Sequence, residues 1–81
     1  MKIKSNIAIS DSGFVFDPST GESFTFNPTG LEIFRHLKEE KSFDEISEII
    51  TAKYDVDEHS FERYYFDFLS MLKQFQLVEN E

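Results

Sequence analysis

The stretch D-P-S-T-G-E-S-F-T-F-N-P-T-G-L, residues 17–31, decides how the rest of this chain folds. It contains a cluster of turn-forming residues, a short aromatic segment at residues 23–27 and the start of a helix. The residues before it have the alternation of extended chain, and the residues after it have helical spacing. The sequence therefore predicts one α+β domain over residues 1–81, in which the strands precede the helices.

Three segments have strand patterns, at about residues 3–10, 14–17 and 23–27. Gly13 and Gly21 can adopt the positive φ that tight hairpin turns require. A two-residue first turn and a three-residue second turn would place four aromatic rings on one face of an antiparallel meander, namely Phe14, Phe16, Phe24 and Phe26. We therefore expect a register that pairs Phe16 with Phe24, Phe14 with Phe26 and Ile9 with Phe16.

Three helices are predicted, at about residues 30–38, 43–53 and 58–75, with Thr29, Ser42 and Asp57 as N-caps. One face of the third helix is apolar and aromatic, with Phe61, Tyr65, Phe68, Leu72 and Phe75. Tyr64, Leu69 and Met71 flank this face, so the apolar sector is wider than a small sheet requires. Either it is a simple core stripe, or one flank lines a groove or meets a second copy of the chain.

Charge and composition exclude several classes of protein. The net charge is −8, of which −7 falls after residue 30, so a nucleic-acid partner is not expected. A winged-helix DNA regulator therefore ranks last among the hypotheses, whereas a basic peptide or protein would suit the charge. The first residues lead into no long apolar run, so we expect no signal peptide, no membrane contact and a cytoplasmic protein.

The sequence predicts no catalytic or metal site. It has no cysteine, and its two histidines, His36 and His59, do not have the spacing of metal ligands. The Asp55-Val56-Asp57 segment begins like a calcium loop, but Ser60 stands where the loop requires glycine. We therefore expect a protein that is not an enzyme and that needs no cofactor.

The segment at residues 23–27 is predicted to be an edge strand with one unpaired row of backbone groups. Proteins usually block such an edge with lysine, proline or a bulge, and residues 23–26 contain neither lysine nor proline. One interpretation is that the edge is kept open for a partner strand. The alternatives are that the strand is too short to matter or that the last helix covers it.

The run D-P-S-T-G-E-S-F-T-F-N-P-T-G-L-E-I-F at residues 17–34 resembles the PqqD-like family, as do Y-D-V-D at residues 54–57 and L-V-E at residues 77–79. The order and spacing of these motifs fit the family over nearly the whole chain. The resemblance implies a winged helix-turn-helix-like domain with three strands and three helices. The chain departs from the family at Gln76, where members often have glycine at the end of the last helix.

The resemblance also implies a function, because family members serve as recognition elements for ribosomally made peptides that are later modified (RiPPs). In members of this kind the precursor's leader adds as a fourth strand to the third strand and packs into a groove beside the third helix. The implied peptide-binding residues are Ser23, Phe24, Thr25, Phe26, Phe61, Tyr64, Tyr65 and Phe68. The implied second partner is a peptide-modifying enzyme, such as a radical-SAM enzyme or a protease.

Two hypotheses of different classes follow from the sequence. The first is a non-catalytic peptide-binding adaptor that presents a leader peptide to an enzyme. The alternative is a structural or assembly domain that forms a homodimer, or docks on a larger protein, through Phe66 and Met71 of the third helix.

Overall fold

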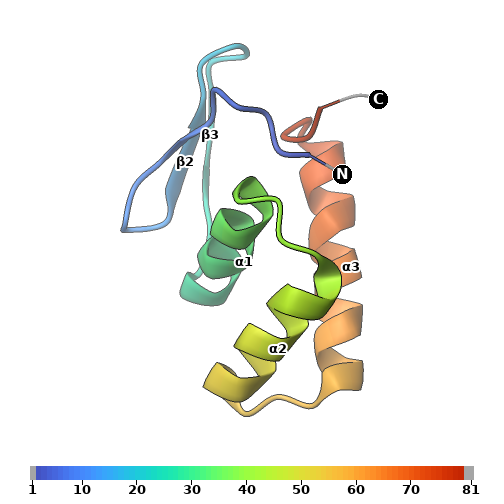
Figure 1. Ribbon diagram of the computed structural model, residues 1–81. Helices are drawn as coiled ribbons and strands as arrows, with labels where there is room; N and C mark the ends of the chain where they lie inside the picture. The colour runs from blue at the N-terminus through green and yellow to red at the C-terminus, as the bar shows by residue number, and fades with distance from the viewer. Residues whose placement is uncertain (1, 80–81) are drawn as a thin grey trace.

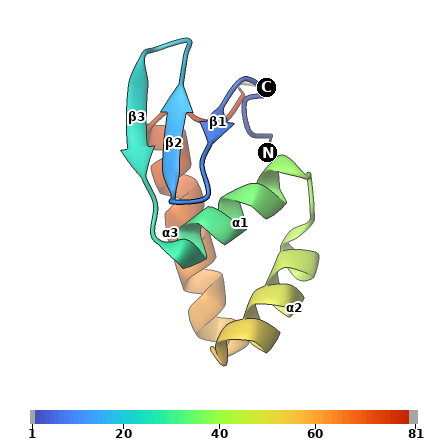
Figure 2. The same ribbon diagram turned by 90° about the vertical axis from the view of Figure 1, so that its left-hand side faces the viewer.

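The computed structural model describes residues 2–79, which form three strands followed by three helices (Figure 1). The elements are β1 (Ala8–Ile9), β2 (Phe14–Asp17), β3 (Glu22–Thr25), α1 (Pro28–Lys38), α2 (Phe43–Tyr54) and α3 (Glu58–Gln74). The strands form one antiparallel sheet in the order β1-β2-β3, and Figure 2 shows this sheet in front of α3. The predicted α+β architecture, a three-stranded meander followed by three helices, is confirmed.

Each helix begins after a residue whose side chain caps its first turn; these residues are Asn27, Ser42 and Asp57. The second and third of these caps are as predicted, but Thr29 does not cap α1. Asn27 does so two residues earlier, because its Oδ1 accepts a hydrogen bond from the Gly30 N–H at 2.7 Å. Pro28 fits the first helical position, where an N–H would have no partner within the helix.

The predicted register of the sheet is wrong by one residue. A four-residue turn joins β2 to β3, so that Val15 lies opposite Phe24 and Phe16 lies opposite Ser23. Ile9 of β1 likewise lies opposite Val15 and not opposite Phe16. In both hairpins the turn is one residue longer than the aromatic pattern predicts.

This shift exchanges the two faces of β2, because successive side chains of a strand point to opposite faces. Val15 and Asp17 point into the core, and both side chains are almost fully buried. Phe14, which is 46% exposed, and the half-buried Phe16 point to the outer face of the sheet. The four phenylalanines therefore do not share a face, and only Phe24 and Phe26 point inward.

The turn chemistry of Asp17 explains the register. Its buried carboxylate accepts hydrogen bonds from the Ser19 N–H at 2.9 Å and the Ser19 hydroxyl at 2.6 Å, and it pairs with Lys4 Nζ at 3.4 Å. Its carbonyl accepts hydrogen bonds from the N–H groups of Thr20 and Gly21. An aspartate that bonds to the backbone two residues ahead stabilises a turn, and Gly21 completes this one in the left-handed region at φ 78°.

The first strand is much shorter than predicted. Only Ala8–Ile9 pairs with β2, and Ile3 instead forms a bridge with Val78, after α3. The Lys4 N–H donates to the Leu77 carbonyl at 3.1 Å. The first described residues therefore run beside the last ones, and the expected strand over residues 3–10 is divided between two partners.

The core lies where the covered face of the sheet meets the three helices. Its fully buried side chains come from every layer and include Val15, Ile33, Phe34, Ile46, Phe61, Leu72 and Leu77. Phe26 joins the layers, because its ring packs edge-on against Phe34 of α1 at 5.3 Å and against Phe68 of α3 at 5.5 Å between ring centroids.

The end of α3 adopts a left-handed cap without glycine. Gln76 has φ 60°, its N–H donates to the Lys73 carbonyl, and the Leu77 N–H donates to the Leu72 carbonyl at 3.0 Å. These two bonds are those of a Schellman motif, which usually places glycine at the left-handed residue. The backbone at the end of α3 therefore adopts the Schellman geometry, although the left-handed residue is Gln76 and not glycine.

We expect Gln76→Gly to stabilise the protein. A side chain in the left-handed region costs about 1–2 kcal/mol, and the greater freedom of glycine in the unfolded chain offsets part of this gain. The expected net gain is about 0.5–1 kcal/mol, or roughly 3–6 °C in Tm for a domain of this size. Thermal unfolding followed by circular dichroism measures it. Gln74→Gly, in the last turn of α3, is the matched control and should lower the Tm; equal effects of the two changes would contradict the argument.

We expect Asp17→Asn to destabilise the protein at pH 7 and to do so much less in acid. Hydrogen bonds from the Ser19 hydroxyl and N–H, together with Lys4, hold the pKa of Asp17 below its ordinary value. The stability that this carboxylate contributes is therefore complete above the unfolded-state pKa, about 3.9, and is lost as the pH falls through the lower folded-state pKa. Urea unfolding at pH 7 and at about pH 2 measures the difference.

The exposed Glu48 of α2 supplies the control for this experiment, as Glu48→Gln. This change should leave the pH dependence of unfolding close to that of the unaltered protein. A destabilisation by Asp17→Asn that is equally large at both pH values would show that the carboxylate's charge does not hold the turn.

Candidate functional site

The sheet has two edge strands, the two-residue β1 and β3, and β3 has β2 on one side and no other strand of residues 2–79 on the other (Figure 2). The Phe26 N–H donates to the Gly13 carbonyl at 2.8 Å, so the backbone of Phe26 faces the neighbouring chain. In an antiparallel ladder this direction alternates along the strand. The N–H and C=O groups of Ser23 and Thr25 therefore face the free edge.

The side chains of β3 alternate between the outer face of the sheet and the face that covers the core. Ser23 and Thr25 are small and exposed, and they lie on the outer face of the sheet. Phe24 and Phe26 point toward α3, where Phe24 stacks on Phe75 at 4.7 Å between ring centroids and Phe26 meets Phe68. Ser23 and Thr25 thus have backbone N–H and C=O groups without a partner strand, and the side chains of Phe24 and Phe26 form an apolar surface with α3.

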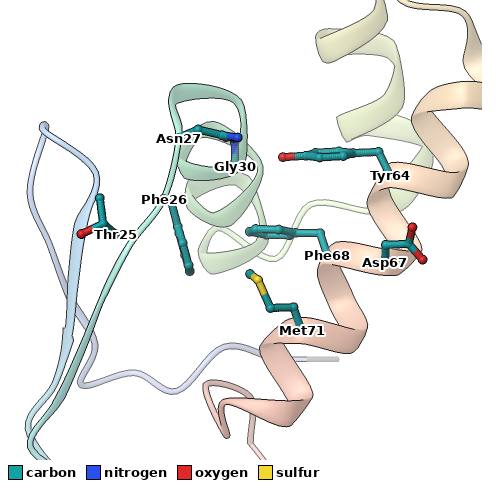
Figure 3. Close-up of a pocket in the computed structure, with 8 residues that line it drawn as sticks. All are labelled: Thr25, Phe26, Asn27, Gly30, Tyr64, Asp67, Phe68 and Met71. Carbon is teal, nitrogen blue, oxygen red and sulfur yellow. Dashed lines mark hydrogen bonds between the residues drawn. The ribbon is translucent and has the colours of Figure 1, made fainter.

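A groove of about 290 Å³ separates the end of β3 from α3 (Figure 3). Its α3 side is built by residues at helical spacing, so that Phe68 and Met71 point from the helix toward Phe26, and Tyr64 points toward Gly30. The complete lining is Thr25, Phe26, Asn27, Gly30, Tyr64, Asp67, Phe68 and Met71. The groove is therefore mainly apolar and carries one carboxylate.

Four of the eight residues predicted to bind peptide meet at this groove: Thr25, Phe26, Tyr64 and Phe68. Ser23 and Phe24 continue the same strand away from it. Phe61 lines a neighbouring hollow of about 320 Å³ on the far side of Tyr64, together with Ile50 and Val56.

Tyr65 lies on a different flank of α3, where it packs edge-on against Phe43 of α2 at 4.8 Å between centroids. Burial raises the pKa of its hydroxyl, as expected for a ring enclosed by the core. Besides Asn27 and Gly30 at the start of α1, the sequence prediction left out Asp67 and Met71 of α3. Their spacing from Tyr64 and Phe68, three residues in each case, is the signal that places all four on one side of the helix.

The two residues suggested for a homodimer interface, Phe66 and Met71, lie on different flanks of α3. Met71 lines the groove, whereas Phe66, which is 52% exposed, stacks on Phe43 at 5.7 Å on another flank of α3. The two residues are five apart, or about 140° around a helix. One flat interface would not use both of them.

Residues 2–79 contain no group of three or more side chains placed to hold a metal ion. Within the same residues, no helix has the length and apolar character needed to cross a membrane.

Comparisons with known proteins agree with this geometry. The family model described as coenzyme PQQ synthesis protein D (PqqD) matches residues 13–78. A solved structure, "TbiB1 in Complex with the TbiA(beta) Leader Peptide", is similar to the whole chain, with a TM-score of 0.87 and 33% sequence identity over 100% of this chain and 98% of that one. Comparison with curated proteins gives no match. The chain therefore belongs to the PqqD family.

Proposed function

We propose that this protein is a non-catalytic adaptor that captures the leader of a ribosomally synthesised precursor peptide by adding it as a strand to β3. The observation that carries the proposal is the open backbone of Ser23 and Thr25 beside an apolar groove. The likeness to TbiB1, which was solved with a leader peptide, supports the same function.

The geometry favours a peptide that is read in two ways. Its main chain would exchange hydrogen bonds with Ser23 and Thr25, which gives affinity without regard to sequence. Because paired strands share faces, every second side chain of the peptide would point toward α3. These side chains would enter the groove formed by Phe26, Phe68 and Met71.

The affinity expected of such a contact is moderate. Each main-chain hydrogen bond contributes about 0.5–1.5 kcal/mol net, and an apolar side chain that becomes buried contributes about 1.5–3 kcal/mol. A segment that becomes ordered on binding loses conformational entropy, which offsets part of this gain. A Kd of about 1 μM, or roughly −8 kcal/mol, is the expectation.

The adaptor would then present the peptide to a modifying enzyme, such as a radical-SAM enzyme or a protease. Strand addition would engage β3, one flank of α3 and the start of α1, and it would leave the outer face of the sheet for the enzyme. The modification of the peptide would be carried out by that enzyme. The groove of this protein is lined mainly by apolar rings with a single carboxylate, which suits holding a peptide.

We expect Thr25→Pro to abolish strand addition while the fold remains. Thr25 directs its N–H to the free edge, so proline removes a donor to the peptide and not a bond within the sheet. Panning a random peptide display library against the protein would supply a binding peptide. Fluorescence anisotropy should then show its affinity weakened by about tenfold or more, which corresponds to about 1.4 kcal/mol.

Thr25→Val keeps the backbone donor and serves as the matched control, with affinity expected to stay within about a factor of two. Amide NMR with the same peptide should move the signals of β3 and of α3 near Tyr64 and Phe68. The proposal is wrong if no peptide is enriched, or if the shifts lie away from β3 and α3.

A further inference from the structure

We infer that the groove selects peptides with a lysine or arginine directed at Asp67, an inference that rests on the proposed peptide binding. Asp67 is the one charged residue among those that line the groove. It lies on α3 between Tyr64 and Phe68, and its carboxylate points away from Phe26, at the exposed edge of the groove (Figure 3). The surroundings of this carboxylate suggest that it determines which peptide side chain the groove accepts.

The Asp67 carboxylate is free to meet a cation from outside the chain. It takes part in none of the ion pairs formed within residues 2–79, although Arg63 stands one turn before it on the same helix. Its residue is exposed, so the carboxylate keeps its water while the groove is empty. A peptide that filled the groove with purely apolar side chains would displace part of this water without replacing its hydrogen bonds.

The shape of the groove suits a long basic side chain. Lysine and arginine have an aliphatic stem that packs on apolar surface and a charged end that reaches polar groups. Phe68 and Met71 provide the apolar surface for such a stem, and Asp67 provides the carboxylate for its end. The half-exposed ring of Tyr64, on the same flank, adds a π face that attracts cations.

The net charge of the chain also favours basic peptides. The net charge is −8, and the exposed part of α3 carries Glu58 and Glu62 as well as Asp67, against Arg63 and Lys73. Such a surface repels acidic peptides and accelerates the association of basic ones at low ionic strength. This general attraction is not specific to one residue, so the experiment has to separate it from the effect of Asp67.

The test begins with a display library of random 12-residue peptides panned against the protein and against Asp67→Asn. We expect lysine or arginine to be enriched at one fixed position in the peptides selected by the unaltered protein. This enrichment should disappear with Asp67→Asn and should change to glutamate or aspartate with Asp67→Lys. Glu62→Gln, which removes the same charge from the same helix outside the groove, should retain the enrichment.

A synthetic pair of peptides then measures the contact directly. One enriched lysine peptide is compared with the same peptide carrying norleucine, which has a similar aliphatic stem and no charge. Against the unaltered protein, norleucine should weaken the Kd about three- to fivefold, the upper part of the range of an exposed ion pair. Against Asp67→Asn the two peptides should bind within about a factor of two, which isolates the pair by a double-mutant cycle.

Three outcomes would overturn the inference. The basic residue could persist after Asp67→Asn, Glu62→Gln could remove it to the same extent, or the bound peptides could show no charge preference. In each case peptide binding along β3 would still be established by Thr25→Pro. If no peptide binds at all, the proposed function fails together with this inference.

Discussion

The packing of Phe26 between Phe34 and Phe68 is the contact on which the rest of the structure depends. It joins the end of the sheet to α1 and α3, and its N–H fixes the strand to the Gly13 carbonyl. Gly13 has φ 96° and lies so near that a Cβ there would stand 2.3 Å from the Phe26 carbonyl oxygen. The first hairpin turn therefore positions the same residue that forms the sheet side of the groove.

Much of the fold could be predicted from the sequence because its signals are local. Apolar periodicity located the three helices, and the side chains of Ser42 and Asp57 marked two of their starts. The register could not be predicted from hydrophobic pattern alone, because that pattern favoured four phenylalanines on one face. The buried Asp17 network outweighed it, and Phe14 was left exposed as a result.

The candidate site was predictable on the strand and less so on the helix. Any antiparallel meander of this order leaves its last strand at an edge, so the backbone of Ser23 and Thr25 followed from topology. The apolar sector of α3 is so broad that its sequence does not say which flank faces the sheet. The placement of α2 decides this, because Phe43 occupies the flank of Tyr65 and leaves the flank of Tyr64 to the groove.

The alternation along β3 limits how much of a partner's sequence this domain can distinguish. Two residues offer outward backbone groups, and a backbone contact is indifferent to side-chain identity. Discrimination is thus confined to the few partner positions whose side chains reach α3. A segment that is recognised at so few positions can be moved from one protein to another. The same short sequence, placed ahead of unrelated peptides, would be bound in the same way, and the sequences of those peptides would be free to diverge.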